Sequence, residues 1–147
     1  MKIILTIALF IGFLTSAIAQ QANSKDDASK KGIASYYHPK FNGRKTATGE
    51  IFQNTKYTAA SNRIRLNSYV KVTNLNNGKV VYVKINDRMA PSNKRLLDMT
   101  EAAAEALEYR EEGLAHVKLE IVSEEEGKIA ILAQKEAATT ARKDNEL

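Results

Sequence analysis

The sequence of 147 residues contains no cysteine and no tryptophan, and only two histidines, His38 and His116. The missing cysteine excludes a disulfide scaffold, a thiolate zinc site, a catalytic cysteine and a lipid-modified N-terminal cysteine. Two histidines are too few for most histidine-built metal sites, so we expect no metal and no cofactor. Hydrophobic residues nevertheless make up 44% of the chain, which is enough for the packed core of one domain of ordinary size.

The first residues have the pattern of a secretion signal. Lys2 precedes an apolar run from Ile3 to Leu14, and Ala17 and Ala19 then put small residues at the positions that a signal peptidase reads. An uncleaved anchor is the alternative, but about twelve apolar residues are fewer than the ~20 that span a bilayer. We therefore predict a signal peptide over residues 1–19, secretion across the inner membrane to the periplasm or cell envelope, and no stable membrane anchor after cleavage.

Composition divides the rest of the chain into three parts. Residues 20–31 are polar with no apolar period, and we predict a linker there. Residues 32–123 hold nearly all the β-branched and aromatic residues and are predicted to be the folded domain. Residues 124–147 begin with three glutamates and end in an Ala/Thr/Lys-rich stretch, which predicts a charged C-terminal tail, loosely helical or disordered.

Strands dominate the predicted domain. Tyr69 to Leu75, Lys79 to Ile85 and Ala115 to Val122 all alternate apolar and polar residues. Asn77-Gly78 between the first two predicts a hairpin with a type I′ turn, in which both central residues take positive φ. A closed barrel is favoured because closure removes exposed strand edges.

A single short helix is predicted after residue 100. Asp98 or Thr100 is suited to cap its free N–H groups, and Asp98 with Glu101 fits a capping box. Gly113 is predicted to end the helix, because glycine tolerates the left-handed conformation found beyond helix C-termini. The fold class is therefore mainly β with one short helix.

Acidic residues are scarce between Lys31 and Arg95. This segment contains thirteen lysines and arginines but only two acids, Glu50 and Asp87. Such an excess of one sign is often a solvated surface; the alternative is a basic groove for an anionic polymer that holds two functional carboxylates. Two carboxylates without histidine clusters or phosphate loops suit glycosidic-bond chemistry, in which a carboxylic acid protonates the leaving oxygen. We therefore expect Glu50 and Asp87 to converge on one groove.

Six segments, in order and in register, together resemble the rare lipoprotein A family. The matching strings are Gly32–Tyr37, Phe41–Glu50, Tyr57–Ala60, Val70–Leu75, Ile85–Arg88 and Leu97–Thr100. The resemblance implies a six-stranded double-psi β-barrel, an architecture shared with expansins. It also implies a lytic transglycosylase that cuts between N-acetylmuramic acid and N-acetylglucosamine in peptidoglycan strands stripped of stem peptides. The muramyl C6 hydroxyl attacks its own anomeric carbon, which leaves a 1,6-anhydro end.

The same resemblance assigns roles to individual residues. Asp87 matches the aspartate of the family's Asn-Asp-Arg motif, the general acid and then base. Glu50 matches the glutamate of the Thr-Ala-x-Gly-Glu motif, the second active-site carboxylate. Asp98 precedes the helix and is a third candidate, with the role of a helix cap as its alternative. Ser61 stands where the family has an active-site histidine, and a hydroxyl cannot hold a proton near neutral pH as imidazole does.

Three residues are predicted to contact the glycan. Either Tyr36 or Tyr37 belongs to the core, because neighbours in a strand face opposite ways, and we assign Tyr37 to stacking on a sugar ring. Arg44 and Arg88 lie in the matching motifs and are assigned to substrate binding.

The sequence thus predicts a secreted, non-lipidated lytic transglycosylase whose partners are peptidoglycan glycan strands. The alternative is a non-catalytic, expansin-like peptidoglycan-binding module, which the serine at position 61 favours. Nucleic acid is not expected as a partner, although the basic segment would attract it, because the signal peptide removes the protein from the cytoplasm.

Overall fold

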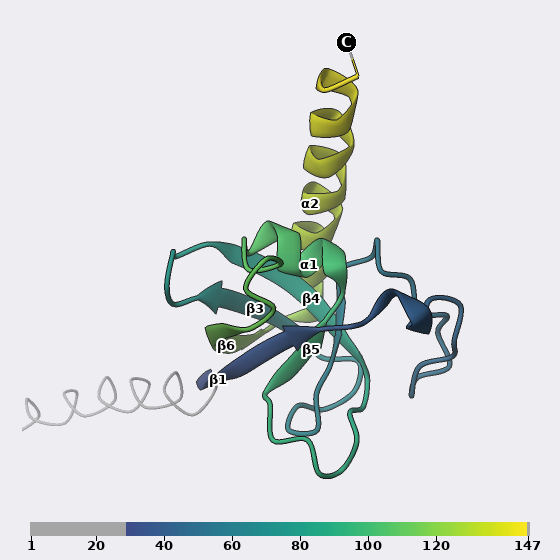
Figure 1. The fold of residues 1–147 in the computed structure, drawn as a ribbon, viewed down its shortest axis with the longest axis vertical. Coiled ribbons are helices and arrows are strands. Elements are labelled where there is room, and N and C mark those ends of the chain that lie inside the picture. Colours follow the sequence, from purple (N-terminus) through teal and green to yellow (C-terminus); the bar gives the residue numbers. More distant parts are fainter. Residues whose placement is uncertain (1–28, 147) are drawn as a thin grey trace, which may run out of the picture.

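A computed structural model describes residues 29–146, so the signal peptide predicted over residues 1–19 lies outside the described residues. The elements in chain order are β1 (Ser29–Tyr36), the 3₁₀ turn η1 (Pro39–Phe41), β2 (Thr58–Ala60), β3 (Tyr69–Asn74), β4 (Val80–Asp87), β5 (Leu97–Met99), α1 (Glu101–Ala106), β6 (Ala115–Val122) and α2 (Glu124–Asp144). The strands close into one barrel in the order β1-β5-β2-β4-β3-β6 (Figure 1), so the expected six-stranded barrel is confirmed.

The barrel mixes parallel and antiparallel pairs. β1 with β5 and β2 with β4 run parallel, and the four remaining pairs run antiparallel. Two long connections, 37–57 from β1 to β2 and 88–96 from β4 to β5, join strands that are not neighbours in the barrel. Residues of both connections line one pocket, which is the candidate site described below.

Alternation along β3, β4 and β6 builds the core. The inward residues Val70, Val72, Val83, Val117 and Leu119 are fully buried, while their sequence neighbours are more exposed. Methyl-rich, β-branched side chains suit this pleated, half-buried surface. The period-two pattern of the sequence therefore identified both the strands and the face that each one buries.

The β3–β4 hairpin forms as expected, but its turn is longer than a type I′ turn. Within the described chain Asn77 is not among the residues with positive φ, and only Gly78 in this turn is left-handed, with φ of 76°. The Gly78 N–H donates to the carbonyl of Asn74 at 2.8 Å. The Asn77 side chain donates to the Leu107 carbonyl at 3.0 Å, and this tie to the end of α1 accounts for the different turn.

The helix α1 is shorter than predicted. It ends at Ala106, and Glu108 takes a left-handed conformation just beyond it, with φ of 55°; Gly113, with φ of 77°, lies in the turn further on. The cause is burial of Leu107 and Tyr109, which are both at most 1% exposed. The chain has to leave the helical path at this point for both side chains to enter the core.

The predicted cap of α1 is also wrong. Asp98 lies inside β5, and Thr100 occupies the N-cap position without a capping hydrogen bond from its side chain. Asn54, from the β1–β2 connection, does this work instead: its Oδ1 accepts from the Glu101 N–H at 2.8 Å. A cap supplied from elsewhere in the chain leaves the Asp98 carboxyl free for another role.

The first predicted segment boundary shifts, and the predicted C-terminal tail is a helix. β1 begins at Ser29, which pairs with Glu120 of β6, so the last three residues of the predicted linker belong to the barrel. The C-terminal tail is a 21-residue helix, α2, that packs against β3 and β4 and then projects from the barrel (Figure 1). No helix in the described part of the chain is long and apolar enough to cross a membrane.

Two contacts dock α2. Gly127 sits so close to β3 that an added Cβ would lie 2.3 Å from the Tyr69 Cβ. About two turns further on, the Gln134 amide accepts from the Tyr82 N–H at 2.6 Å and donates to the Tyr82 carbonyl at 2.9 Å. A helix side chain thereby hydrogen-bonds the backbone of β4 where β2 does not reach.

Replacing Gly127 by alanine tests this docking. Overpacking against Tyr69 costs ~1–3 kcal/mol, which exceeds the ~1 kcal/mol of helix propensity that alanine gains over glycine. We expect a lower melting temperature and faster amide exchange at Tyr82. The exposed substitution Ala133→Gly serves as the control for propensity alone. A higher melting temperature for Gly127→Ala would contradict the close approach.

Candidate active site

The register of four strands places two aspartates in one row. Ser35 of β1 pairs with Asp98 of β5, Asp98 pairs with Ala60 of β2, and Ala60 pairs with Asp87 of β4 across a local register shift. Ala60 therefore separates the two aspartates, whose backbones lie about 10 Å apart at two strand spacings. The alanine side chain between them is fully buried and packs with Tyr37 and Phe52.

A pocket of about 330 Å³ opens over this row. Its floor is the pair Asp87 and Asp98, and its walls come from the two long connections. The wall residues are Tyr37, Phe41, Arg44, Lys45 and Phe52 from the first connection and Arg88, Met89, Ala90 and Asn93 from the second. The pocket thus combines two carboxyl groups with aromatic rings and cations.

Three donors fix the carboxylate of Asp87. Its Oδ2 accepts from the Tyr37 hydroxyl at 2.8 Å. Its Oδ1 accepts from the backbone N–H groups of Ala47 at 3.0 Å and of Arg88 at 2.8 Å. Hydrogen bonds to a charged acceptor are the stronger kind, so the orientation of Asp87 is set by the loop on each side of it and by Tyr37.

Tyr37 is placed as a support for Asp87 rather than as an open stacking surface. Its ring is 9% exposed and packs on Phe52 at 4.5 Å between ring centres, with the edge of Phe41 at 5.5 Å. Burial, together with the hydrogen bond to Asp87, raises the pKa of the Tyr37 hydroxyl well above its usual range. The hydroxyl therefore stays protonated and donates.

Asp98 lies in a different environment from Asp87. Its carboxyl accepts from the Ser35 hydroxyl at 3.0 Å, and Arg95 donates to that hydroxyl oxygen at 3.2 Å. Burial raises the pKa of Asp98 above its usual range, and the charge of Asp87 adds to this effect, whereas Ser35 and Arg95 oppose it. Burial therefore favours the protonated form of the Asp98 carboxyl.

Glu50 does not line this pocket, so Glu50 and Asp87 do not share one pocket as we expected. Glu50 lines a separate pocket beside α2, where Lys84 Nζ lies 2.5 Å from its Oε1 and Asn86 donates to its Oε2 at 3.3 Å. Partial burial opposes the charge, but the bonds from Lys84 and Asn86 outweigh it and hold the pKa of Glu50 below its usual range. Successive residues of β4 face opposite ways, which is why Asn86 and Asp87 serve different pockets.

Ser61, at the position of the family histidine, is fully buried and lines neither pocket. Its hydroxyl donates to the Leu96 carbonyl at 2.9 Å and accepts from the Arg63 N–H at 3.2 Å. The Arg88 guanidinium is tied in a similar way, because it donates to the carbonyls of Ser61 and Ile64. Both side chains hold the loop that follows β2 against the loop that follows β4.

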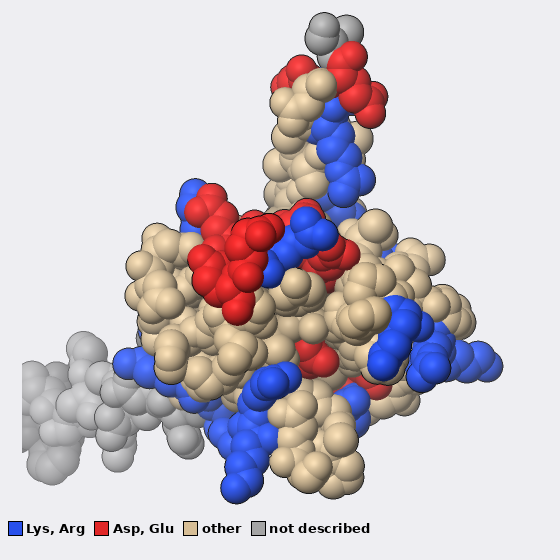
Figure 2. Space-filling model, viewed as in Figure 1, with Lys and Arg blue, Asp and Glu red and all other residues tan. Residues whose placement is uncertain are grey.

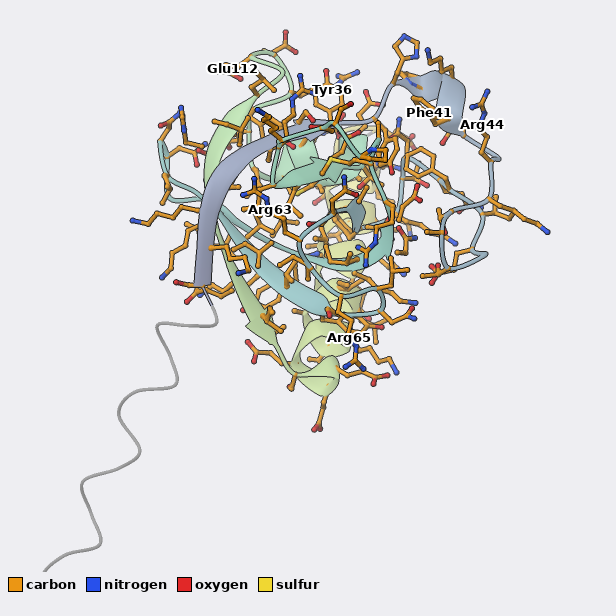
Figure 3. The ribbon with its side chains drawn as sticks, turned by 90° about the horizontal axis from the view of Figure 1, so that it is seen from below. Tyr36, Phe41, Arg44, Arg63, Arg65 and Glu112 are labelled. Carbon is orange, nitrogen blue, oxygen red and sulfur yellow. The ribbon has the colours of Figure 1, made fainter. Side chains whose placement is uncertain are left out.

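Phe41 is a site residue that sequence reasoning missed. It lies half-buried in the pocket, and the guanidinium carbon of Arg44 stands 5.3 Å from its ring centre. Figure 3 shows the two side chains next to each other on the connection that follows β1. An aromatic residue three positions before an arginine in a glycine-containing loop was the available signal. A ring with a cation on one face suits contact with an anionic sugar.

Acidic and basic side chains gather on different parts of the face shown in Figure 2. Figure 2 shows acidic side chains gathered over α1 and the turn that follows it, and basic side chains over the connection that carries Arg44. The acids on this turn are Glu108, Glu111 and Glu112. Within residues 29–146, no group of three or more His, Asp or Glu side chains is arranged to hold a metal ion.

Comparison with known proteins places this barrel in a family. A family profile described as lytic transglycolase matches residues 29–119. The endolytic peptidoglycan transglycosylase RlpA of Pasteurella multocida is 39% identical over 134 residues, which cover 88% of this chain and 46% of that protein. The RlpA protein of Haemophilus influenzae is 44% identical over 101 residues, which cover 69% and 35%. The chain therefore spans less than half the length of these relatives.

Solved structures share the fold at low sequence identity. The Streptomyces papain inhibitor superposes with a TM-score of 0.53 at 19% identity and covers 65% of this chain and 94% of its own. A Clavibacter michiganensis expansin in complex with cellohexaose gives 0.52 at 17% identity and covers 65% and 50%. The profile match covers most of the chain, and the closed barrel agrees with it. The chain therefore belongs to the RlpA-like family of double-psi β-barrel lytic transglycosylases.

Proposed function

We propose that this protein is a peptidoglycan lytic transglycosylase that cleaves the bond between N-acetylmuramic acid and N-acetylglucosamine in strands lacking stem peptides. The observation that carries the proposal is the pair Asp87 and Asp98 on the floor of one pocket, in two different environments. Glycosidic-bond cleavage needs a proton donor and a carboxylate near the anomeric carbon. Membership of the family supports this chemistry, and the signal peptide predicted over residues 1–19 would deliver the protein, non-lipidated, to the periplasm or cell envelope.

The division of labour between the aspartates follows from their surroundings. Asp98, whose pKa is raised by burial, donates its proton to the oxygen of the departing N-acetylglucosamine as the bond to the muramyl C1 breaks. The carboxylate of Asp87 faces the positive charge that develops at C1 and takes the proton of the C6 hydroxyl as that oxygen bonds to C1. The product carries a 1,6-anhydro ring, no water is consumed, and the proton returns to Asp98 through solvent.

Other residues act by placing these two carboxyl groups. Tyr37 orients Asp87 through its hydroxyl. Glu50 acts at a distance: its contacts with Lys84 and Asn86 hold the loop whose Ala47 N–H bonds Asp87. Arg44 and Phe41 are proposed to contact the sugar, and Arg88 contributes its backbone N–H to Asp87.

A non-catalytic, expansin-like glycan-binding module is the second candidate. The observation in its favour is Ser61, whose buried hydroxyl brings no titratable group to the position of the family histidine. The two candidates differ in one product, because only the enzyme creates 1,6-anhydro ends.

Replacing either aspartate by asparagine separates the two candidates. An amide cannot deliver or accept the proton, and general acid–base help is typically worth ~10²–10⁴ in rate. We expect Asp98→Asn and Asp87→Asn to lose cleavage by about that factor while strand binding persists. Glycan products that end in a 1,6-anhydro muramyl sugar are counted by mass spectrometry. The matched control is Glu111→Gln, an acid in the turn after α1. Strand binding by the wild type without any anhydro product would favour the binding module.

The pH profile should report Asp98. A general acid has to be protonated, so the rate is expected to fall as pH rises through the pKa of Asp98. The Arg95 guanidinium lowers that pKa, so Arg95→Gln should move the alkaline limb of kcat/KM to higher pH. The neighbouring exposed cation gives the control Lys94→Gln. An alkaline limb that stays in place with Arg95→Gln would remove Asp98 from the role of the acid.

Removing the Tyr37 hydroxyl tests whether it positions Asp87. In Tyr37→Phe the ring still packs on Phe52. We therefore expect the free energy of unfolding to change by no more than about 1 kcal/mol. Loss of a charge-assisted hydrogen bond should lower kcat about tenfold with little change in KM. A raised KM at unchanged kcat would show instead that Tyr37 binds the sugar directly.

A further inference from the structure

A second pocket, of about 340 Å³, lies between the barrel and α2 on the other side of the 45–51 loop. Four lysines and one acid surround it, with apolar and aromatic side chains between them. The lining includes Lys56, Lys84, Lys128, Lys135, Glu50 and Ile131. We call this cavity the lysine pocket. α2 supplies half of these side chains, and it lies beyond the residues that the family profile matches.

The charges of the lysine pocket are only partly neutralised. Lys84 pairs with Glu50, and Lys128 pairs with Glu124 of its own helix. Neither Lys56 nor Lys135 forms an ion pair with any carboxylate of residues 29–146. Two cations therefore face the cavity with no anion of the described chain beside them, which leaves them available to an anionic ligand.

One short loop separates the lysine pocket from the pocket that contains Asp87 and Asp98, which we call the aspartate pocket. The Lys45–Ile51 bridge closes this loop, and Lys45 lines the aspartate pocket while Glu50 lines the lysine pocket. A polymer that occupies the first pocket and continues across the loop would reach the second. A small ligand would not need this continuity, and a strand of sugars does.

We propose that the lysine pocket is a distal subsite for the same glycan strand, in which Lys56 and Lys135 bind the free lactyl carboxylates of muramic acid residues. This inference rests on the proposed function for the identity of the polymer. In a strand stripped of stem peptides each lactyl group ends in a carboxylate, whereas an attached peptide converts it to a neutral amide. Tyr57 and Ile131 offer apolar surface for the sugar rings, and the lysines provide the opposite charge.

The subsite gives a physical cause for a preference for stripped strands. A lysine ammonium is a compact charge on a flexible stem and needs no fixed geometry to reach a carboxylate. Such half-exposed pairs are individually weak and are screened by salt. The preference should therefore be modest for each sugar, and it should fade as ionic strength rises.

The test compares two strands that differ only in that charge. The full chain with Asp87→Asn, which keeps the strand intact, is titrated with stripped glycan strands and with the same strands after conversion of the lactyl carboxylates to methylamides. Adding Lys56→Gln and Lys135→Gln together should weaken binding of the free-carboxylate strand about five- to thirtyfold. Binding of the methylamide strand should not change. The control, Lys30→Gln with Lys143→Gln, removes the same charge elsewhere.

The outcomes separate this inference from the proposed activity. Equal weakening for both strands, or none for either, would overturn the subsite even where the wild type cleaves. A selective loss supports it even where the wild type yields no anhydro product. A third arm uses phosphatidylglycerol vesicles: if the two lysines are needed for vesicle binding and not for strand binding, the pocket faces a membrane surface and the glycan subsite is overturned.

Discussion

The pairing of the three-residue strand β2 with β5 on one side and β4 on the other organises the whole site. Ala60 in its last position faces Asp98 across one ladder and Asp87 across the other. Barrel closure fixes this row, because each strand has neighbours on both sides and no strand is free to slip without moving its apolar residues out of the core. The strand ladders thus fix the backbone positions of the two aspartates, and the loop groups around Asp87 then orient its carboxylate.

Much of the fold could be read from the sequence because it depends on local patterns. Alternating valines in β3 and β4 identified strands, and the family motifs identified the barrel. What failed were details decided by distant partners. The cap of α1 comes from Asn54, 47 residues before the helix residue that it contacts. The length of α1 depends on burial of Tyr109, and the docking of α2 depends on Gly127 meeting Tyr69. None of these leaves a periodic signal.

The candidate site was only partly predictable for a similar reason. A charge count singled out Glu50 and Asp87 as isolated acids. It cannot tell that Asp87 lies on one face of β4 while Glu50 contacts residues on the other face. Asp98 could not be separated from a helix cap until Asn54 was seen to fill that role. Ser61, read as a substitute for a catalytic histidine, is a buried tie between two loops. Sequence patterns assign chemistry to residues, whereas register and burial decide which residues meet.

The amide of Gln134 covers a part of the β4 edge that would otherwise be exposed. β4 is eight residues long and its neighbour β2 only three, so part of β4 has an edge that no strand covers. Exposed edges recruit strands of other molecules. Gln134 from α2 hydrogen-bonds both the backbone N–H and the backbone carbonyl of Tyr82. These two groups are then not available to a strand of another molecule. The C-terminal helix thereby covers part of a strand edge, in addition to forming a wall of the lysine pocket.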